Sequence, residues 1–340
     1  MTGKGRLLLL LGAVLVLGSV AAFAVHHAVE RAGGRGRPQP PAAADGRVWL
    51  AAPAGTGRRM IFRNTAGGSH RDALASVPTD RPEAQRATSQ LKCLRFSAAG
   101  GTGICLQSAP GPLRASYRAV VVDERLNERR SYPLSGVPSR ARVSPSGHLV
   151  AWTVFVSGDS YGATAFSTRT SVLDTRTGKL QDNLEEYDLK VDGSWYRSLD
   201  VNVWGVTFAD DGHFYATVST RGQTYLAKGD IAAHSLTTVH GNVECPSLSP
   251  DGTRIAYKKR VPGLPADSPW RLYVLDLRTM TETATAEHRN VDDQAVWATD
   301  TTLVYALPGK SGTDLWTVPA HGSGTPQRLA SAAATPAFIG

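Results

Sequence analysis

A G-x-S-x-G pattern is the first candidate for chemistry in this sequence of 340 residues. Residues 158–162, Gly-Asp-Ser-Tyr-Gly, match the nucleophile elbow of hydrolases, where a strand turns sharply into a helix and exposes the serine oxygen beside backbone N–H donors. Here the pattern follows one alternating strand, LVAWTVFVS, and precedes another, without a helix pattern. We therefore expect a hairpin loop and no catalytic serine at this position.

The nine histidines form no recognisable metal-binding motif. No pair has ligand spacing on a plausible element, and the sequence contains no H-E-x-x-H, C-x-x-C or glycine-rich phosphate loop. His148 and His213 each follow a turn glycine, where we expect a structural role. On this basis we predict no catalytic residue and no cofactor.

The elements that would position any site come from a repeated phrase: a few apolar residues, a tight turn ending near glycine, and an alternating apolar strand. The clearest copies lie at 142–155 (RVSPSGHLVAWTVF), 207–219 (TFADDGHFYATVS) and 247–260 (SLSPDGTRIAYKKR). With the weaker copies RFSAAGGTGICLQ, AVWATDTTLVYAL and AADGRVWLAAP, the six turns are anchored at Gly46, Gly100, Gly147, Gly212, Gly252 and Thr301. Copies 40 to 65 residues apart, each followed by further strand patterns, predict an all-β, six-bladed β-propeller over residues 45–340.

The two ends of the repeat predict how the ring closes. The first copy begins at the second strand of its blade, and the chain ends with TPAFIG after the last strand of the sixth copy. We expect this fragment to supply the innermost strand of the first blade, because pairing the two ends removes exposed sheet edges.

The copy SPDGTRIAY, followed by LYVLDLRT, resembles the propeller repeat of TolB-like proteins, a motif also found in the propellers of some serine peptidases. The resemblance covers nearly all of residues 46–340 and implies a six-bladed propeller. TolB itself carries an α/β domain before its propeller, whereas this chain has an apolar segment and a tether there. The resemblance is therefore limited to the propeller, and it does not imply a Tol-type partner.

The N-terminus predicts a membrane anchor. Residues 7–25 carry no charge and follow Lys4 and Arg6, and about 20 apolar residues span a bilayer as a helix. We assign residues 1–32 to a transmembrane anchor; Ala22-Phe23-Ala24 leaves a cleaved signal peptide, and hence secretion, as the alternative. Residues 33–44, GGRGRPQPPAAA, read as a flexible tether.

The cysteines point to an oxidising compartment outside the cytoplasm. Cys93 and Cys105 lie symmetrically about Ala99, in two predicted strands joined by a glycine-rich turn. Facing positions of an antiparallel pair are close enough for a disulfide, so we predict one here, with two buried free thiols as the alternative. Cys245 has no obvious partner. The net charge of +8 is partly contributed by the N-terminal leader, and no basic stripe interleaved with aromatics indicates nucleic-acid binding.

The innermost strands bring a set of side chains to the predicted channel mouth. When the copies are aligned on their turns, the equivalent position near the start of each innermost strand is occupied by Lys92, Ser139, Trp204, Glu244 or Asp293. Glu244 and Asp293 are weak candidate ligands for a cation such as calcium, which favours oxygen donors, but Lys92 in the same ring favours an internal ion pair.

One face of the propeller carries the long loops. Loops between the second and third strands and between blades share that face, and it receives the insertions at 108–117, 156–165, 185–200 and 261–270. These insertions contain aromatic residues that we interpret as candidate partner-binding residues, with packing as local core as the alternative: Tyr161, Tyr187, Trp195, Tyr196 and Trp270.

These patterns together predict a membrane-anchored, extracytoplasmic propeller that binds a protein or peptide of the cell envelope and is not an enzyme. The alternatives are a metal-dependent propeller enzyme of the lyase or lactonase type, or a small-ligand sensor, each using the channel mouth.

Overall fold

The repeated phrase forms a β-hairpin because a serine and a glycine close its turn. In the copy at 247–260, Gly252 donates its N–H to the carbonyl oxygen of Ser249 over 2.9 Å and adopts a φ of +71°, a conformation that glycine enters without strain. The Ser249 hydroxyl accepts a hydrogen bond from the N–H of Arg254 over 3.0 Å. Gly147 and Ser144 make equivalent contacts in the copy at 142–155. The turn therefore determines where each innermost strand ends.

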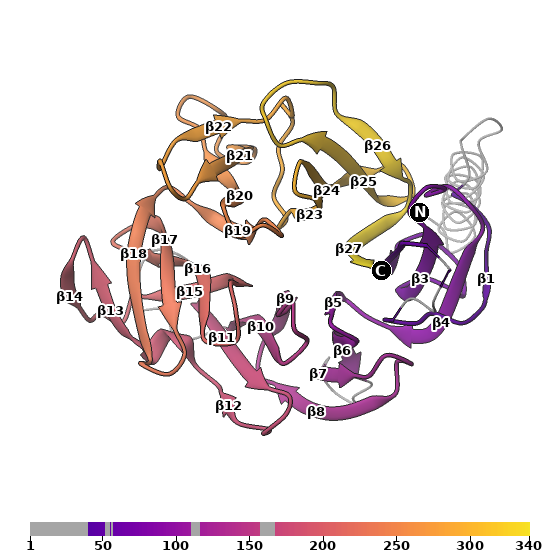
Figure 1. The fold of residues 1–340 in the computed structure, drawn as a ribbon, viewed down its shortest axis with the longest axis horizontal. Helices are drawn as coiled ribbons and strands as arrows, with labels where there is room; N and C mark the ends of the chain where they lie inside the picture. The colour runs from indigo at the N-terminus through magenta and orange to yellow at the C-terminus, as the bar shows by residue number, and fades with distance from the viewer. Residues whose placement is uncertain (1–39, 52–54, 56, 110–115, 157–166) are drawn as a thin grey trace, which may run out of the picture. The chain divides into compact units, whose positions relative to one another are not determined.

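The computed structural model describes residues 40–51, 55, 57–109, 116–156 and 167–340. Residues 41–340 form a ring of six sheets, as predicted for a six-bladed β-propeller (Figure 1). From channel to rim, blade 1 contains Ala333–Ile339 (β27), Arg59–Asn64 (β2), Ala73–Pro78 (β3), Arg86–Lys92 (β4) and Ala43–Asp45 (β1); blade 2 contains Arg95–Ala99 (β5), Thr102–Ala109 (β6), Ser116–Val122 (β7) and Glu128–Leu134 (β8); blade 3 contains Val137–Val143 (β9), Leu149–Val156 (β10), Ser167–Asp174 (β11) and Leu180–Gln181 (β12).

The second half of the ring follows the same order. Blade 4 contains Asn202–Phe208 (β15), His213–Thr220 (β16), Gln223–Asp230 (β17), Ser235–Gly241 (β18), Asp188–Val191 (β13) and Ser194–Tyr196 (β14); blade 5 contains Glu244–Leu248 (β19), Arg254–Arg260 (β20), Trp270–Asp276 (β21) and Glu282–Ala284 (β22); blade 6 contains Val296–Thr299 (β23), Thr302–Gly309 (β24), Gly312–Pro319 (β25) and Gln327–Ala330 (β26). A short 3-10 helix, Leu184–Glu186 (η1), precedes β13.

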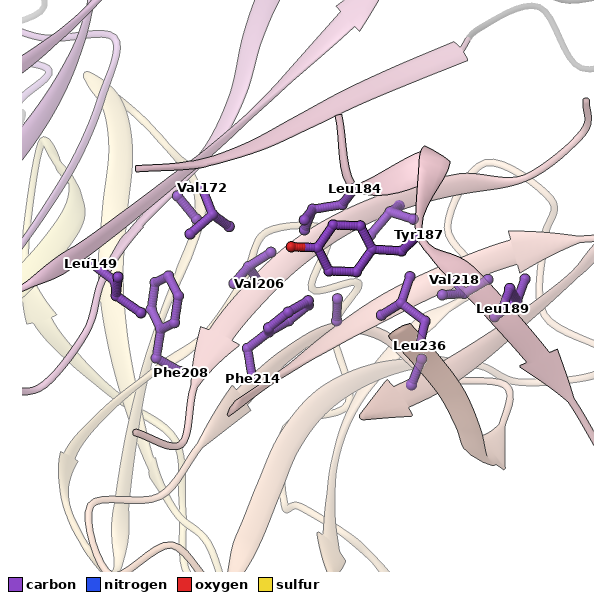
Figure 2. Packing of buried hydrophobic residues seen from close by; sticks show 14 of the residues in the cluster. Leu149, Val172, Leu184, Tyr187, Leu189, Val206, Phe208, Phe214, Val218 and Leu236 are labelled. Carbon is purple, nitrogen blue, oxygen red and sulfur yellow. The ribbon is translucent and has the colours of Figure 1, made fainter. Parts of the chain in front are cut away.

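The core of the propeller lies between the blades. Because successive side chains of a strand point to opposite faces, Ile61 packs toward blade 2 while Met60 and Phe62 pack toward blade 6. The described residues form six such apolar clusters, one between each pair of neighbouring blades. In the cluster between blades 3 and 4, Leu149 meets Phe208 (Figure 2). The alternating apolar pattern of the repeat is therefore explained by burial on both faces.

The C-terminal strand closes the ring. β27 is the innermost strand of blade 1 and pairs antiparallel with β2, with Ile61 opposite Ala337 and Met60 opposite Phe338. The last strand of the chain thus completes the first blade, as a closed propeller requires.

Arg86 of β4 reinforces this closure from inside blade 1. Its side chain is fully buried and donates to Asn64 Oδ1 over 2.6 Å, to the carbonyl oxygen of Ala332 over 3.0 Å, and to that of Ser331. The guanidinium also lies 5.0 Å from the ring centroid of Phe62. One buried cation therefore joins the early part of the chain to the segment that leads into β27.

The start of blade 1 differs from the sequence prediction. Gly46 does not anchor a hairpin turn: Ala43–Asp45 forms β1, which pairs parallel with β4 at the rim. Val48 and Leu50 then pack between blades 1 and 2 without forming a strand. The hairpin of this blade is formed by β2 and β3. The segment AADGRVWL therefore resembles the repeat in sequence but does not form its hairpin. Ala43 and Ala44, the last two residues that we assigned to the tether, belong to β1.

The structure joins Cys93 and Cys105 by a disulfide with a Cα–Cα distance of 5.3 Å. The two residues do not face each other across a hairpin, because Cys105 of β6 lies opposite Phe96 of β5. Cys93 precedes β5, in the connection from blade 1. The bond therefore ties that connection to the second strand of blade 2.

The predicted membrane helix and the predicted loop at 185–200 both concern segments outside the regular four-stranded blades. No helix within the described ranges is long and apolar enough to cross a membrane, and the apolar segment at 7–25 lies outside those ranges. The insertion at 185–200 was predicted to extend a loop face, but its residues 188–196 form β13 and β14, which add to the outer edge of blade 4 (Figure 1).

Candidate binding site at the channel mouth

A cavity of about 1290 Å³ opens at one end of the central channel. Its walls come from the first residues of the innermost strands and from the loops between the second and third strands of blades 4, 5 and 6. We call this end the mouth face, and the opposite end, with the short turns at 144–147 and 249–252, the turn face. The innermost strands of blades 2 to 5 each bring one or two of their first residues to the cavity, and Asp293 reaches it from just before the innermost strand of blade 6.

Bulges adjust the innermost strands near the cavity. The ladders of β9, β15, β19 and β27 each contain a register shift. Gly205, Cys245 and Thr335 have positive φ values of +66°, +51° and +48° in these strands. Bulges re-aim side chains and are common beside functional sites.

The predicted ring of mouth residues is largely present. Ser139, Trp204, Glu244 and Asp293 all line the cavity. Lys92 does not, because it ends β4 near the rim of blade 1; Arg95, the first residue of β5, occupies the blade 2 position in its place. The prediction placed the start of the blade 2 strand three residues too early.

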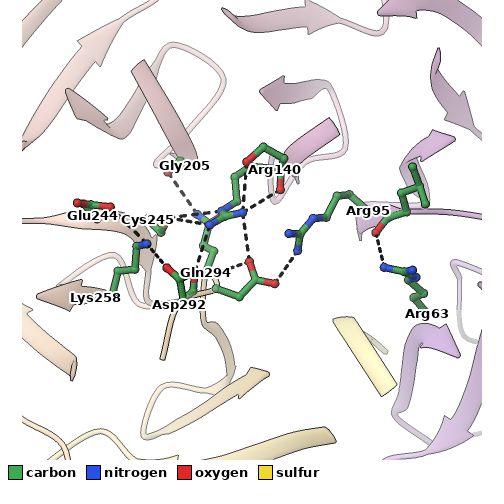
Figure 3. Close-up of polar contacts among 12 residues, drawn as sticks. Arg63, Arg95, Arg140, Gly205, Glu244, Cys245, Lys258, Asp292 and Gln294 are labelled. Carbon is green, nitrogen blue, oxygen red and sulfur yellow. Dashed lines mark hydrogen bonds and ion pairs between the residues drawn. The ribbon is translucent and has the colours of Figure 1, made fainter. Parts of the chain in front are cut away.

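Ion pairs connect the mouth residues in two groups (Figure 3). Lys258 of β20 lies 3.3 Å from Glu244 and 2.6 Å from Asp292. Asp293 lies 2.6 Å from Arg95 and 3.5 Å from Arg140 of β9. Burial alone would raise the pKa of Asp293, but the charges of Arg95 and Arg140 outweigh it and hold that pKa well below its usual range.

The two weak candidate metal ligands, Glu244 and Asp293, are therefore already paired with cationic side chains of the protein. Glu244 contacts Lys258, and Asp293 contacts two arginines. Within the described part of the chain, no group of three or more His, Cys, Asp or Glu side chains is arranged to hold a metal ion. As a pair of oxygen ligands, Glu244 and Asp293 lack the additional donors that calcium requires.

Cys245 is a buried thiol beside the mouth. Its sulfur lies 3.4 Å from both Nε and Nη2 of Arg140, which donate to it (Figure 3). Next to Cys245, the side-chain amide of Gln294 donates a hydrogen bond to the carbonyl oxygen of Pro246 over 2.6 Å. These contacts fix the direction of the Arg140 guanidinium.

Tryptophans and cations contact one another in the cavity wall. Two cations lie against Trp270: the ammonium of Lys258 is 4.3 Å from the ring centroid, and the guanidinium of Arg260 is 4.5 Å from it. Arg289 lies 3.8 Å from the ring centroid of Trp316. The cavity is thus lined by five cations and three carboxylates: Arg95, Arg140, Lys258, Arg260 and Arg289, with Glu244, Asp292 and Asp293. The surplus of positive charge favours an anionic ligand.

Of the four predicted partner-binding aromatics that the structure describes, Trp270 lies in this cavity, whereas Tyr187, Trp195 and Tyr196 line a separate cavity of about 800 Å³. Tyr187 is a buried core residue that stacks on His234. Trp195 and Tyr196 lie on β14 at the outer edge of blade 4; Trp195 is 67% exposed, and Tyr196 accepts a hydrogen bond from Thr220. Tyr161 and the G-x-S-x-G pattern at 158–162 lie outside the described residues.

The two histidines that follow turn glycines contact turn aspartates. His148 Nδ1 lies 2.7 Å from Asp211, which also accepts from Ser146, so this contact bridges blades 3 and 4 at the turn face. His213 Nδ1 lies 3.0 Å from Asp210 in its own turn. Both arrangements support turn structure.

Sequence reasoning did not identify the arginines and lysines of the mouth. For Lys258 the SPDG turn gives only an approximate signal: the register that it sets, with Ser247 opposite Ala256, would place Lys259 opposite Glu244, and the bulge between Glu244 and Ser247 brings Lys258 there instead. No comparable local signal existed for Arg95 and Arg140, because their common partner Asp293 is distant in sequence.

Comparisons with known proteins support the fold. No protein-family model matches the chain, and no curated protein matches it. The structure of a Mycobacterium tuberculosis puromycin-hydrolysing peptidase matches at 14% identity over 85% of this chain and 46% of the other, with a TM-score of 0.50. A chain from the crystal structure of the nidogen/laminin complex matches at 10% identity over 83% of this chain and 98% of the other, with a TM-score of 0.54. Likenesses at this identity concern the fold alone, and this chain spans less than half of the matched peptidase.

Proposed function

We propose that this protein is a binding module that engages a protein or peptide at the mouth of its central channel. The observation that carries the proposal is the cavity of about 1290 Å³, which exceeds the range of roughly 300–1,000 Å³ usual for small-molecule pockets. Its lining of tryptophans held by arginines and lysines has the composition of interface hot spots. An extended segment suits such an open, aromatic and cationic surface better than a small molecule does.

We further propose that the protein works outside the cytoplasm, held at a membrane by residues 7–25, and that its propeller is TolB-like. The disulfide between Cys93 and Cys105 supports an oxidising compartment. The repeat SPDGTRIAY supports the family resemblance. The proposal includes no catalysis, since the mouth carboxylates serve as ion-pair partners of the surrounding cations.

A screen of random dodecapeptides against the full-length, detergent-solubilised chain tests the function. We expect a subset of peptides to be retained, and Trp270→Ala to weaken their binding on the order of 30-fold, as for a central aromatic anchor. Trp195→Ala, which alters an exposed tryptophan at the rim, is the matched control and should leave binding unchanged. Failure to retain any peptide, or loss of binding in the Trp195 variant alone, would contradict the proposal.

A further inference from the structure

The channel narrows below the mouth into a second chamber of about 40 Å³. The two spaces adjoin, because five residues line both of them: Arg95, Ser139, Arg140, Asp293 and Ala306. A water molecule's share of liquid volume is roughly 30 Å³, so the chamber admits one small polar group. A ligand that fills both spaces would have a large body and a small tip.

Two buried polar atoms in the wall of this chamber have no hydrogen-bond partner within the described part of the chain. Arg142 of β9 makes no side-chain hydrogen bond or ion pair with any described residue, and its Nε is buried. The Thr335 hydroxyl on the closing strand β27 is also buried without a partner, and both residues line the chamber. Buried polar groups are nearly always satisfied in native proteins. Since a guanidinium only donates and a hydroxyl can donate, the missing partner is a hydrogen-bond acceptor.

The charges around the chamber agree with an anionic acceptor. Arg95, Arg140 and Arg142 surround a single carboxylate, Asp293, which already pairs with the first two. Burial lowers the pKa of Arg142 to about 10, and the nearby Arg140 adds to this effect while Asp293 opposes it. Arg142 therefore remains a cation at neutral pH; it is partly buried beside another cation and has no ion-pair partner among the described residues.

We propose that the chamber receives a carboxylate group from a bound peptide, with Arg142 and Thr335 donating to its oxygens. This inference rests on the proposed function, because the rest of the peptide would occupy the mouth. A planar carboxylate matches the guanidinium fork and suits the small chamber better than a tetrahedral phosphate does. The carboxylate comes from an acidic side chain or from the C-terminus of the peptide.

Peptides retained in the dodecapeptide screen provide the test. We expect their affinity to fall at least about tenfold when Asp and Glu are replaced by Asn and Gln, or when the C-terminus is amidated, which identifies the source of the carboxylate. Arg142→Gln in the full-length chain should weaken binding by a similar factor, and Arg142→Lys by less. Arg278→Gln is the matched control, because Arg278 is exposed in a turn of the turn face. Acetate should compete with the peptide, and inorganic phosphate at equal ionic strength should not.

The variant without ligand gives a second readout. Arg142→Gln removes a partly buried charge that has no ion-pair partner among the described residues, so the thermal midpoint of the variant should equal or exceed that of the wild type. A marked decrease would show that Arg142 has a structural role and would overturn the inference.

The outcomes separate this inference from the function on which it rests. Retained peptides whose binding is independent of carboxylates and of Arg142, or a preference for phosphopeptides, would overturn the inference and leave the binding function standing. A screen that retains no peptide would contradict the binding function itself.

Discussion

Glu185 links two blades through an acidic side chain held by uncharged donors. Its carboxylate accepts from the Thr168 hydroxyl over 2.9 Å and from the Thr170 N–H over 3.2 Å, both in blade 3, and from the Val203 N–H of blade 4 over 3.2 Å. Burial raises the pKa of Glu185 to about 7, although these hydrogen bonds favour the ionised form. Glu185 does not line the mouth cavity, and its contacts tie blade 3 to blade 4.

A pH dependence of stability follows from that pKa. Because the folded-state pKa exceeds the ordinary glutamate value of 4.5, the folded protein binds more protons than the unfolded chain between about pH 4.5 and 7, and stability falls as pH rises through this window. We expect Glu185→Gln to remove this fall in stability. Between about pH 4.5 and 7, the unfolding free energy of the variant should therefore increase relative to that of the wild type by on the order of 1–3 kcal/mol. Urea unfolding of both proteins at several pH values measures it, and parallel pH profiles would contradict the assignment.

The closing strand β27 is the element on which the ring depends most. It contributes Ala337 and Ile339 to the cluster between blades 1 and 2, and Ala333 to the cluster between blades 6 and 1. It also contributes Thr335 to the inner chamber. One strand therefore supports both the seam of the ring and the deepest part of the proposed site.

Deleting residues 335–340 should weaken the whole propeller. The deletion removes buried apolar side chains and exposes the edge of β2, which we expect to lower the thermal midpoint by on the order of 10 °C. Deleting Gly340 alone, an exposed terminal residue, is the matched control and should have little effect. Differential scanning calorimetry provides the comparison, and equal midpoints for the two deletions would show that the seam does not depend on β27.

Elements whose pattern is local could be predicted from the sequence, and those set by distant pairing could not. The SPSG and SPDG turns revealed the hairpins because serine and glycine close the turn within a few residues. The assignment of residues 185–200 to a loop face failed because β13 pairs in parallel with β18, more than 40 residues away. The copy at Gly46 failed because turn residues and alternation recur by chance in a short segment. Trp204, Glu244 and Asp293 were placed correctly at the mouth, since the start of an innermost strand follows from its turn.

At the scale of the whole molecule, the two faces of the propeller differ in the side chains that they carry. The turn face carries short, internally bonded turns, whereas the mouth face gathers tryptophans and a surplus of cations around an open cavity. This difference is why we propose that a ligand binds at the mouth and not at the exposed rim hairpin of β13 and β14.

Hydrogen–deuterium exchange of the full-length chain, with and without a peptide retained in the screen, tests this placement most directly. We predict that the peptide slows exchange in residues 219–224, 258–262 and 289–293, which line the cavity. Exchange in residues 194–199 of the rim and in residues 249–253 of the turn face should be unchanged. Protection confined to the rim hairpin or to the turn face would contradict the account.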